Sequence, residues 1–213
     1  MNLTEQKIFD YAEEISSPEN EILKQLSRET HLKVMNPIML TGSIQGKLLQ
    51  FLSNMIQPQA ILEIGTFTGY SAICLAQGLK SEGKLHTIER DPELEEICRK
   101  YIALAGFEEK IHLHIGDALQ IVPQLNIKFD LIFIDCDKEI YCEVYNLVFD
   151  KLKPGGYILA DNVLWHGKIF DEHEQNDKET KGIIKFNTHV RNDKRAENFL
   201  LPFRDGLMII KKL

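Results

Sequence analysis

The 213-residue chain is long enough for one sizeable hydrophobic core and short for two. Its 44% hydrophobic and 27% charged residues are typical of a globular protein, and its formal net charge of −7 disfavours a general electrostatic affinity for nucleic acid. No signal-peptide pattern and no apolar run of ~20 residues is present, so no membrane span is expected. The four cysteines include no CxxC pair, which indicates reduced thiols and a cytoplasmic protein.

The first forty residues have the apolar spacing of helices. Apolar residues recur at helical intervals from 8 to 15, and Ser17 before Pro18 is a good N-cap for a second helix. A third helix is indicated by the apolar residues between 48 and 56. We expect residues 1–40 to form a helical extension of one domain that spans residues 1–213.

Five short apolar runs alternate with helical segments from residue 60 onward. The runs are AILEIG (60–65), KLHTIE (84–89), KIHLHIG (110–116), FDLIFID (129–135) and YILAD (157–161). KPGG, at 153–156, is expected to turn the chain into the last run. Regular strand–helix alternation predicts right-handed βαβ units on a parallel sheet.

Two further strands are predicted at the end of the chain, after a helix around residues 180–191. ENFLLPF and LMIIKKL are separated by the tight turn at RDG, so the last strand is expected to run antiparallel. The predicted fold class is therefore α/β and Rossmann-like. It has a seven-stranded, mostly parallel sheet with an antiparallel last strand and helices on both faces.

Acidic residues stand at the carboxyl end of every predicted parallel strand. In an open parallel sheet, ligands bind beyond these ends, near the point where the strand order reverses. The acids are Glu63, Glu89, Asp117, Asp135 and Asp161. If they served only solubility, some of these positions would carry Lys, Ser or Asn, so the pattern indicates a shared ligand site.

The loop EIGTFTGYS after the first strand has Gly65 and Gly69 in a GxxxG spacing. A dinucleotide site requires GxGxxG, in which the middle glycine admits a pyrophosphate, and Phe67 occupies this region here. Glu89 could accept the ribose hydroxyls of NAD or of S-adenosylmethionine. The glycine pattern favours S-adenosylmethionine, although Glu89 alone could equally be a salt-bridging acid and Asp117 a helix N-cap.

Asp135 and the pair Asp161–Asn162 follow two nearby strands. Two carboxylates and an amide oxygen are hard ligands for an octahedral divalent cation such as Mg²⁺. Lys138 lies three residues beyond Asp135, which places it in the same pocket and suits a general base. In isolation, DCDK (135–138) would instead be read as an acidic helix N-terminus.

These blocks resemble the cation-dependent class I O-methyltransferases, the family of the caffeoyl-CoA and catechol O-methyltransferases and of many bacterial relatives. The resemblance runs from about Met35 to the C-terminus. It is carried by MLTGSIQGKLLQFL, ILEIGTFTGYSAICLA, TIERD, GDALQIVPQL, FDLIFIDCDKEIY, LKPGGYILADNVLWHGKI, FN and LLPFRDGLMIIKK. Cys136 stands where Ala or His is common in the family, and RDG departs from the plant members, which leaves the substrate open.

The resemblance implies a role for each site residue. The metal ligands would be Asp135, Asp161 and Asn162, with Mg²⁺ expected and Mn²⁺ or Ca²⁺ as alternatives. Lys138 would be the catalytic base. The residues implied to contact S-adenosylmethionine are Thr41, Glu63, Gly65, Phe67, Ser71, Glu89, Asp117, Ala118 and Asp135. The residues implied to shape the acceptor pocket are Met39, Tyr141 and Trp165.

The expected function is transfer of a methyl group to a hydroxyl of a catechol-like vicinal diphenol, by a homodimer without a membrane partner. One alternative is methylation of hydroxyuridine in tRNA, for which the basic run at 185–195 could serve. A third reading, an NAD-dependent reductase, lacks the diphosphate loop that it would need. The polar loop at 166–180 is interpreted either as a lid on the acceptor pocket or as solvated surface.

Overall fold

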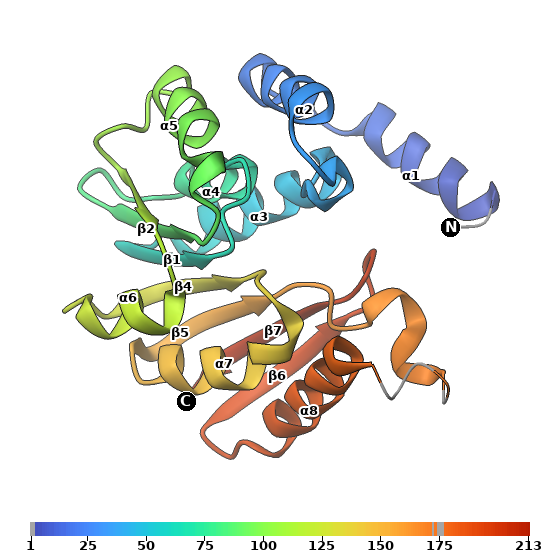
Figure 1. Cartoon of the computed structure of the whole chain (residues 1–213), viewed down its shortest axis with the longest axis vertical. Coiled ribbons are helices and arrows are strands. Elements are labelled where there is room, and N and C mark those ends of the chain that lie inside the picture. The colour runs from blue at the N-terminus through green and yellow to red at the C-terminus, as the bar shows by residue number, and fades with distance from the viewer. Residues whose placement is uncertain (1–2, 172, 174–176) are drawn as a thin grey trace.

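The computed structural model describes residues 3–171, 173 and 177–213, with side chains from residue 7 onward. The chain begins with helices, as the sequence predicts: α1 (Leu3–Ile15), α2 (Glu21–Lys33), the 3₁₀ turn η1 (Pro37–Met39) and α3 (Ser43–Ile56). Figure 1 shows α1 extending away from the body, whereas α2 and α3 lie against it. The predicted loop at 166–180 includes positions 172 and 174–176, which lie outside the described residues.

Strands and helices alternate through the rest of the chain. The remaining elements are β1 (Ala60–Ile64), α4 (Tyr70–Ala76), β2 (Lys84–Glu89), η2 (Pro92–Leu94), α5 (Glu95–Leu104), β3 (Ile111–Ile115), α6 (Ala118–Gln124), β4 (Phe129–Ile134), η3 (Lys138–Ile140), α7 (Tyr141–Phe149), β5 (Leu152–Ala160), η4 (Trp165–Phe170), α8 (Lys178–Asn192), β6 (Ala196–Leu201) and β7 (Leu207–Lys212).

The seven strands form one sheet in the order β3-β2-β1-β4-β5-β7-β6. The pairs among β1 to β5 are parallel, and β7 pairs antiparallel with both β5 and β6. This confirms the predicted Rossmann-like sheet with its antiparallel last strand. The strand order reverses between β1 and β4, so ligands are expected beyond the carboxyl ends of these two strands.

Helices cover both faces of the sheet (Figure 1). One core packs α2, α3, α4 and α5 against β1, and the other packs α6, α7 and α8 against the opposite face. Each strand of the centre therefore contributes to both cores: Ile61 and Leu62 of β1, adjacent in sequence, are both fully buried on opposite faces. This explains why the central runs are continuously apolar.

One predicted boundary is wrong. The sequence predicts a turn at 153–156, but β5 already begins at Leu152 and includes these residues. The pairing with β4 shifts register between Phe129 and Leu131, and Gly155 has φ of 75°. The segment is thus an irregular start of the strand, which a glycine pair permits and which sequence alone does not separate from a turn.

The structure bears on membrane-spanning helices and on the state of the cysteines. Within the described residues, no helix is both long enough and apolar enough to cross a membrane. All four cysteines lie in that part of the chain and none forms a disulfide.

Candidate active site

Three neighbouring strands end at one level of the sheet. The registers of β1 with β4 and of β4 with β5 place Gly65, Asp135 and Asp161 directly after paired residues. The N–H of Asp161 donates to the carbonyl oxygen of Ile134 at 3.0 Å, and that of Asp135 donates to Ile64 at 2.8 Å. The two aspartates therefore follow directly after adjacent strands. The backbones of neighbouring strands lie about 4.8 Å apart in the hydrogen-bonding direction.

Gly65 permits this close approach of the β1 and β4 ends. It has φ of +97°, and a Cβ at this position would lie 1.8 Å from the carbonyl oxygen of Asp135. Both the backbone conformation and the contact therefore require glycine. Gly65, which belongs to the predicted ligand loop, thus also brings the two strand ends together.

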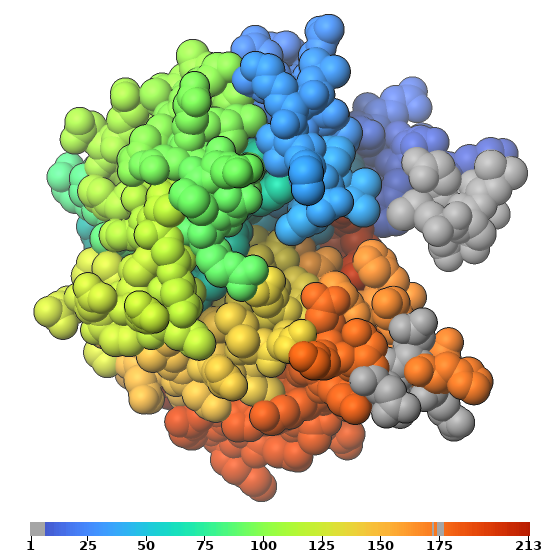
Figure 2. Space-filling model, viewed as in Figure 1, coloured from blue at the N-terminus to red at the C-terminus, as the bar shows by residue number. Residues whose placement is uncertain are grey.

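A cleft of about 1830 Å³ opens at this edge of the sheet. In Figure 2 it lies where the blue N-terminal helices, the green α5 region and the orange segment after β5 meet. Twelve of the predicted site residues line it: Met39, Thr41, Gly65, Phe67, Glu89, Asp117, Ala118, Asp135, Lys138, Asp161, Asn162 and Trp165. The strand ends thus bring most of the predicted site into one cleft.

Three predicted site residues lie behind the cleft wall: Glu63, Ser71 and Tyr141. The Glu63 carboxylate accepts a hydrogen bond from the Thr87 hydroxyl at 2.5 Å, and its Oε1 is buried without a hydrogen-bond partner among the described residues. Burial raises the pKa of Glu63 to about 8. At neutral pH this carboxyl therefore carries a proton.

Backbone N–H groups orient the Glu89 carboxylate in the cleft. The N–H of Phe67 donates to Oε2 at 2.7 Å, and that of Asp91 donates to Oε1 at 2.9 Å. Burial raises the pKa of Glu89, and these hydrogen bonds oppose that shift. Asp117 is also the N-cap of α6, since its side chain accepts from the N–H of Leu119 at 2.9 Å. The N-cap alternative is thus observed, and Asp117 lines the cleft as well.

Lys138 is the buried cation of the site. Its Nζ donates to Asp135 Oδ1 and to the Tyr141 hydroxyl, both at 2.8 Å, and it lies 5.8 Å from the centroid of the Trp165 ring. The Tyr141 hydroxyl in turn donates to the carbonyl oxygen of Asp161 at 2.9 Å. Tyr141 therefore supports Lys138 from below, and its ring forms no part of the cleft wall.

The Asp161 carboxylate is fixed from two sides. Its Oδ1 accepts the N–H of Asn162 at 2.9 Å, and its Oδ2 accepts Nε2 of Gln45 at 2.5 Å. Burial, followed by the nearby charge of Asp135, raises the pKa of Asp161 to about 6. The buried Asp161 and the partly buried Asp135 thus share one site, and Lys138 is bonded to Asp135.

No group of three or more His, Cys, Asp or Glu side chains in the described part of the chain has an arrangement that could hold a metal ion. The predicted set contains only two such residues, Asp135 and Asp161, and its third member is the amide of Asn162. The backbone of Asn162 is left-handed, with φ of 57°. Carboxylate and amide oxygens remain the donor types that hard divalent cations accept.

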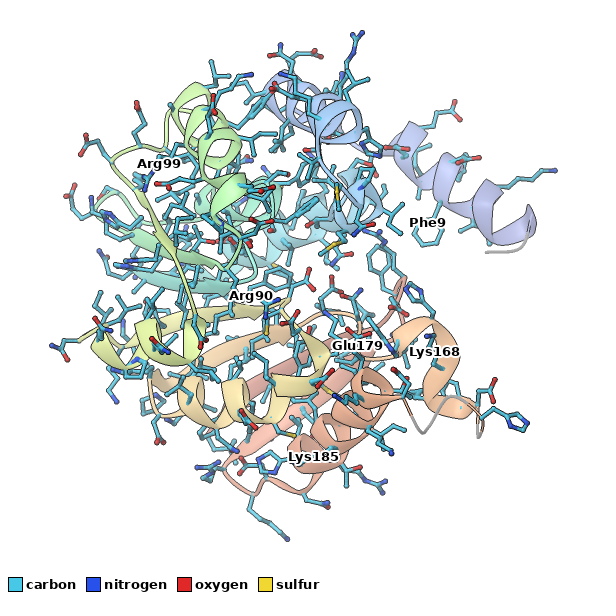
Figure 3. All side chains as sticks on the ribbon, in the orientation of Figure 1. Phe9, Arg90, Arg99, Lys168, Glu179 and Lys185 are labelled. Carbon is cyan, nitrogen blue, oxygen red and sulfur yellow. The ribbon has the colours of Figure 1, made fainter. Side chains whose placement is uncertain are left out.

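Sequence reasoning missed several residues of the cleft. Gln45 lies in the segment MLTGSIQGKLLQFL, but no pattern in the sequence links it to Asp161, 116 residues away. Phe9 of α1 and Phe203 of the β6–β7 turn also line the cleft, with their ring centroids 5.8 Å apart. Figure 3 shows Phe9 on the side of α1 that faces the body of the molecule. Only the tertiary structure brings these segments together.

A model of the family described as O-methyltransferase matches residues 13–213. The chain belongs to the O-methyltransferase family. The sequence-based resemblance to this family is confirmed, as is the predicted class of enzyme. The match covers all of the strand ends that build the cleft.

Individual relatives agree with the family assignment. The chain is 38% identical over 155 residues to a catechol O-methyltransferase of Niastella koreensis, a match that covers 71% of this chain and 70% of the relative. It is 31% identical to a probable caffeoyl-CoA O-methyltransferase of Dictyostelium discoideum, over 97% of this chain and 91% of the relative. Among solved structures, an O-methyltransferase from Bacillus cereus in complex with SAH has a TM-score of 0.92 and 28% identity, with 97% of each chain covered.

Proposed function

We propose that the protein is an S-adenosylmethionine-dependent and divalent-metal-dependent O-methyltransferase that methylates a hydroxyl of a catechol-like vicinal diphenol. One observation carries this proposal: Asp135, Asp161 and Lys138 converge at the edge of the cleft next to the Gly65 loop. Relatives whose names contain catechol and caffeoyl-CoA O-methyltransferase support the choice of a phenolic acceptor.

The cofactor would occupy the part of the cleft between Gly65 and α6. Glu89 would accept the two ribose hydroxyls, because its carboxylate is oriented by backbone N–H groups and faces the cleft. Asp117 and Ala118, at the start of α6, would contact the adenine. The methionine half would lie along four lining residues of the predicted cofactor set, Thr41, Gly65, Phe67 and Asp135. Glu63 and Ser71 of the same set would support this wall from behind. A solved relative with SAH bound supports the choice of cofactor.

The charge balance of the site fits a divalent cation. The pKa of Asp161 is raised by burial and by the charge of Asp135, so these two carboxylates are short of positive charge. With the Asn162 amide they form a set of hard oxygen donors, which suits Mg²⁺ first and Mn²⁺ or Ca²⁺ as alternatives. Such a cation, when bound, lowers the pKa of a coordinated hydroxyl.

Residues of this chain would supply the rest of the chemistry. After losing its ammonium proton to solvent, the Lys138 amine would accept the proton of the acceptor hydroxyl. Its Nζ is buried at the cleft wall and held by Asp135 and Tyr141. The oxyanion then attacks the sulfonium methyl, so that the new O–C bond forms as the S–C bond breaks and SAH leaves. Positioning of oxygen and methyl near 3 Å can contribute roughly 7–11 kcal/mol to such a transfer.

The acceptor would lie between Trp165, Met39 and the Phe9–Phe203 pair. These side chains line the cleft and offer flat, apolar surfaces to an aromatic ring. We assign Tyr141 a different role from the pocket wall of the sequence prediction. Because it is fully buried and bonded to Lys138, it would orient the base.

Replacement of Asp161 tests this proposal. Asp161→Ala is expected to abolish turnover that depends on Mg²⁺, with catechol or caffeate as acceptor, because one of two carboxylate ligands is lost. Calorimetry should show SAH binding within about twofold of the unaltered protein. An equal loss of SAH binding would contradict the assignment of Asp161 to the metal, and unchanged Mg²⁺-dependent turnover would contradict the site itself.

Three further expectations belong to the same proposal. The alternative substrate is tRNA. The basic run at 185–195 ends where β6 begins, and this end of β6 lies at the edge of the sheet opposite the cleft.

A homodimer is supported by the exposed apolar residues Ile8, Tyr11 and Ile15 of α1, and light scattering would test it. We place the enzyme in the cytoplasm, in line with its free cysteines.

A further inference from the structure

Gln45 is a buried amide in the first turn of α3, with 4% of its surface exposed. It lies between two charged groups from distant parts of the chain. Its Nε2 donates to Asp161 Oδ2 at 2.5 Å, and its Oε1 accepts from a guanidinium nitrogen of Arg204 at 2.8 Å. The same nitrogen of Arg204 also donates to the carbonyl oxygen of Thr41.

The partners of Gln45 fix the direction of its amide. A guanidinium has only donors, so the oxygen of the amide must face Arg204, and an ionised carboxylate only accepts, so the NH₂ group must face Asp161. The reversed amide would place its NH₂ group against the donors of Arg204 and its oxygen against the oxygen of Asp161. Arg204 therefore determines that Gln45 presents a donor to Asp161.

This donor sets the plane of the Asp161 carboxylate. The N–H of Asn162 holds Oδ1 and Gln45 holds Oδ2, so the side chain is constrained at both oxygens. A neutral amide does so without adding a charge. If Arg204 contacted Asp161 directly, the ion pair would compete with a cation for the same carboxylate. Gln45 lies between the guanidinium of Arg204 and the carboxylate of Asp161.

We propose that Gln45 is a positioning residue that orients the Asp161 carboxylate toward a divalent cation, and that Arg204 acts through Gln45. The inference rests on the proposed metal dependence. Hydrogen-bond partners of metal ligands typically contribute 10–100-fold to metal affinity, because they fix the orientation of the ligand. Gln45 contributes to the affinity for the cation and leaves the cofactor half of the cleft unchanged.

The test measures Mn²⁺ binding directly, by electron paramagnetic resonance of the full chain in the presence of SAH. Gln45→Leu keeps the approximate volume and removes both hydrogen bonds, so the Kd for Mn²⁺ is expected to rise roughly 10–100-fold. The Kd for SAH should stay within about twofold. In turnover, the KM for Mn²⁺ rises while kcat at saturating Mn²⁺ stays within about threefold, a split that general loss of packing does not produce.

Gln50→Leu is the matched control. Gln50 lies on the same helix, is half-buried, and donates to Gln77 at 2.7 Å, away from the cleft. This variant is expected to bind Mn²⁺ as the unaltered protein does. An equal rise of the Kd for Mn²⁺ in Gln50→Leu would overturn the proposal, since it would show that any polar loss on α3 has the same effect.

A double-mutant cycle tests the role of Arg204. Arg204→Leu alone is expected to weaken Mn²⁺ binding severalfold, and it should have no further effect in the Gln45→Leu protein, because it acts through the amide. Equal effects in both backgrounds would overturn this link. If the unaltered protein binds no Mn²⁺, the proposed metal dependence fails. If it binds Mn²⁺ and Gln45→Leu binds it equally well, the positioning role fails.

Discussion

At the scale of single residues, Lys138 is the group whose surroundings most restrict its role. Its side chain is 7% exposed and is bonded to Asp135 on one side and to the Tyr141 hydroxyl on the other. A long lysine side chain on a protein surface would lose much of its entropy if held in one geometry. Here the packing against Trp165 and Tyr141 already holds it at the cleft wall.

Lys138→Met is expected to lower kcat roughly 10²–10⁴-fold, the usual contribution of a positioned general base. Methionine keeps most of the length of the side chain but cannot accept a proton. SAH affinity should be unchanged. Steady-state turnover and calorimetry measure the two quantities. Lys80→Met, at an exposed position, is the control. Full turnover of Lys138→Met would remove the base from the mechanism.

Glu63 gives the cofactor-free protein a specific pH dependence. Its carboxyl titrates at a pKa of about 8 when folded, because it is buried, against 4.5 ordinarily. Between these values the folded state binds the extra proton, so the free energy of unfolding falls as pH rises, by up to about 1.4 kcal/mol per unit. Glu63→Gln should flatten this slope in urea unfolding between pH 5 and 8, and the slope that remains comes from other buried acids such as Asp161, whose pKa is also raised.

The exposed Glu82 supplies the comparison for that experiment. Glu82→Gln should keep the slope of the unaltered protein, because Glu82 is exposed and is not among the groups that act on Glu63. An unchanged slope in Glu63→Gln would show that Glu63 takes up no extra proton on folding, which would contradict its raised pKa.

At the scale of elements, the end of β1 and the end of β4 depend on one glycine. Gly65→Ala is expected to destabilise the protein more than Gly106→Ala. Both glycines have positive φ, of +97° and +74°, but a Cβ on Gly106 meets nothing within 4 Å. Backbone strain alone costs roughly 1–3 kcal/mol, and the excess in Gly65→Ala measures the contact with Asp135.

Urea unfolding of both variants provides the comparison, and Mn²⁺ binding shows whether the separated strand ends still form the site. Gly65→Ala should lose Mn²⁺ binding and Gly106→Ala should keep it. Equal stability of the two variants would contradict the view that the close approach of β1 to β4 requires glycine.

At the scale of the whole molecule, α1 closes one side of the cleft although it extends from the body. Phe9 is its contact with the distant Phe203, and both rings line the cleft. Phe9→Ala is expected to raise the KM for the phenolic acceptor roughly 2–10-fold, which corresponds to the ~0.5–1.5 kcal/mol of an aromatic pair. SAH affinity should not change.

Glu14→Ala, at an exposed position of the same helix, separates the aromatic contact from a general loss of α1. It should leave the acceptor KM unaltered. If Phe9→Ala has no effect on KM but lowers kcat and SAH affinity together, α1 contributes to the cofactor half of the cleft and not to the acceptor.

The sequence by itself determined the order of the elements, the parallel sheet and the acids at the strand ends, because these follow from local periodicity and from the geometry of βαβ units. The tertiary structure alone decided that Gln45 meets Asp161, that Tyr141 lies beneath Lys138, and that Phe9 reaches Phe203. Such contacts join segments far apart in the chain, and their geometry depends on how helices pack on the sheet. No local pattern of residues encodes that packing.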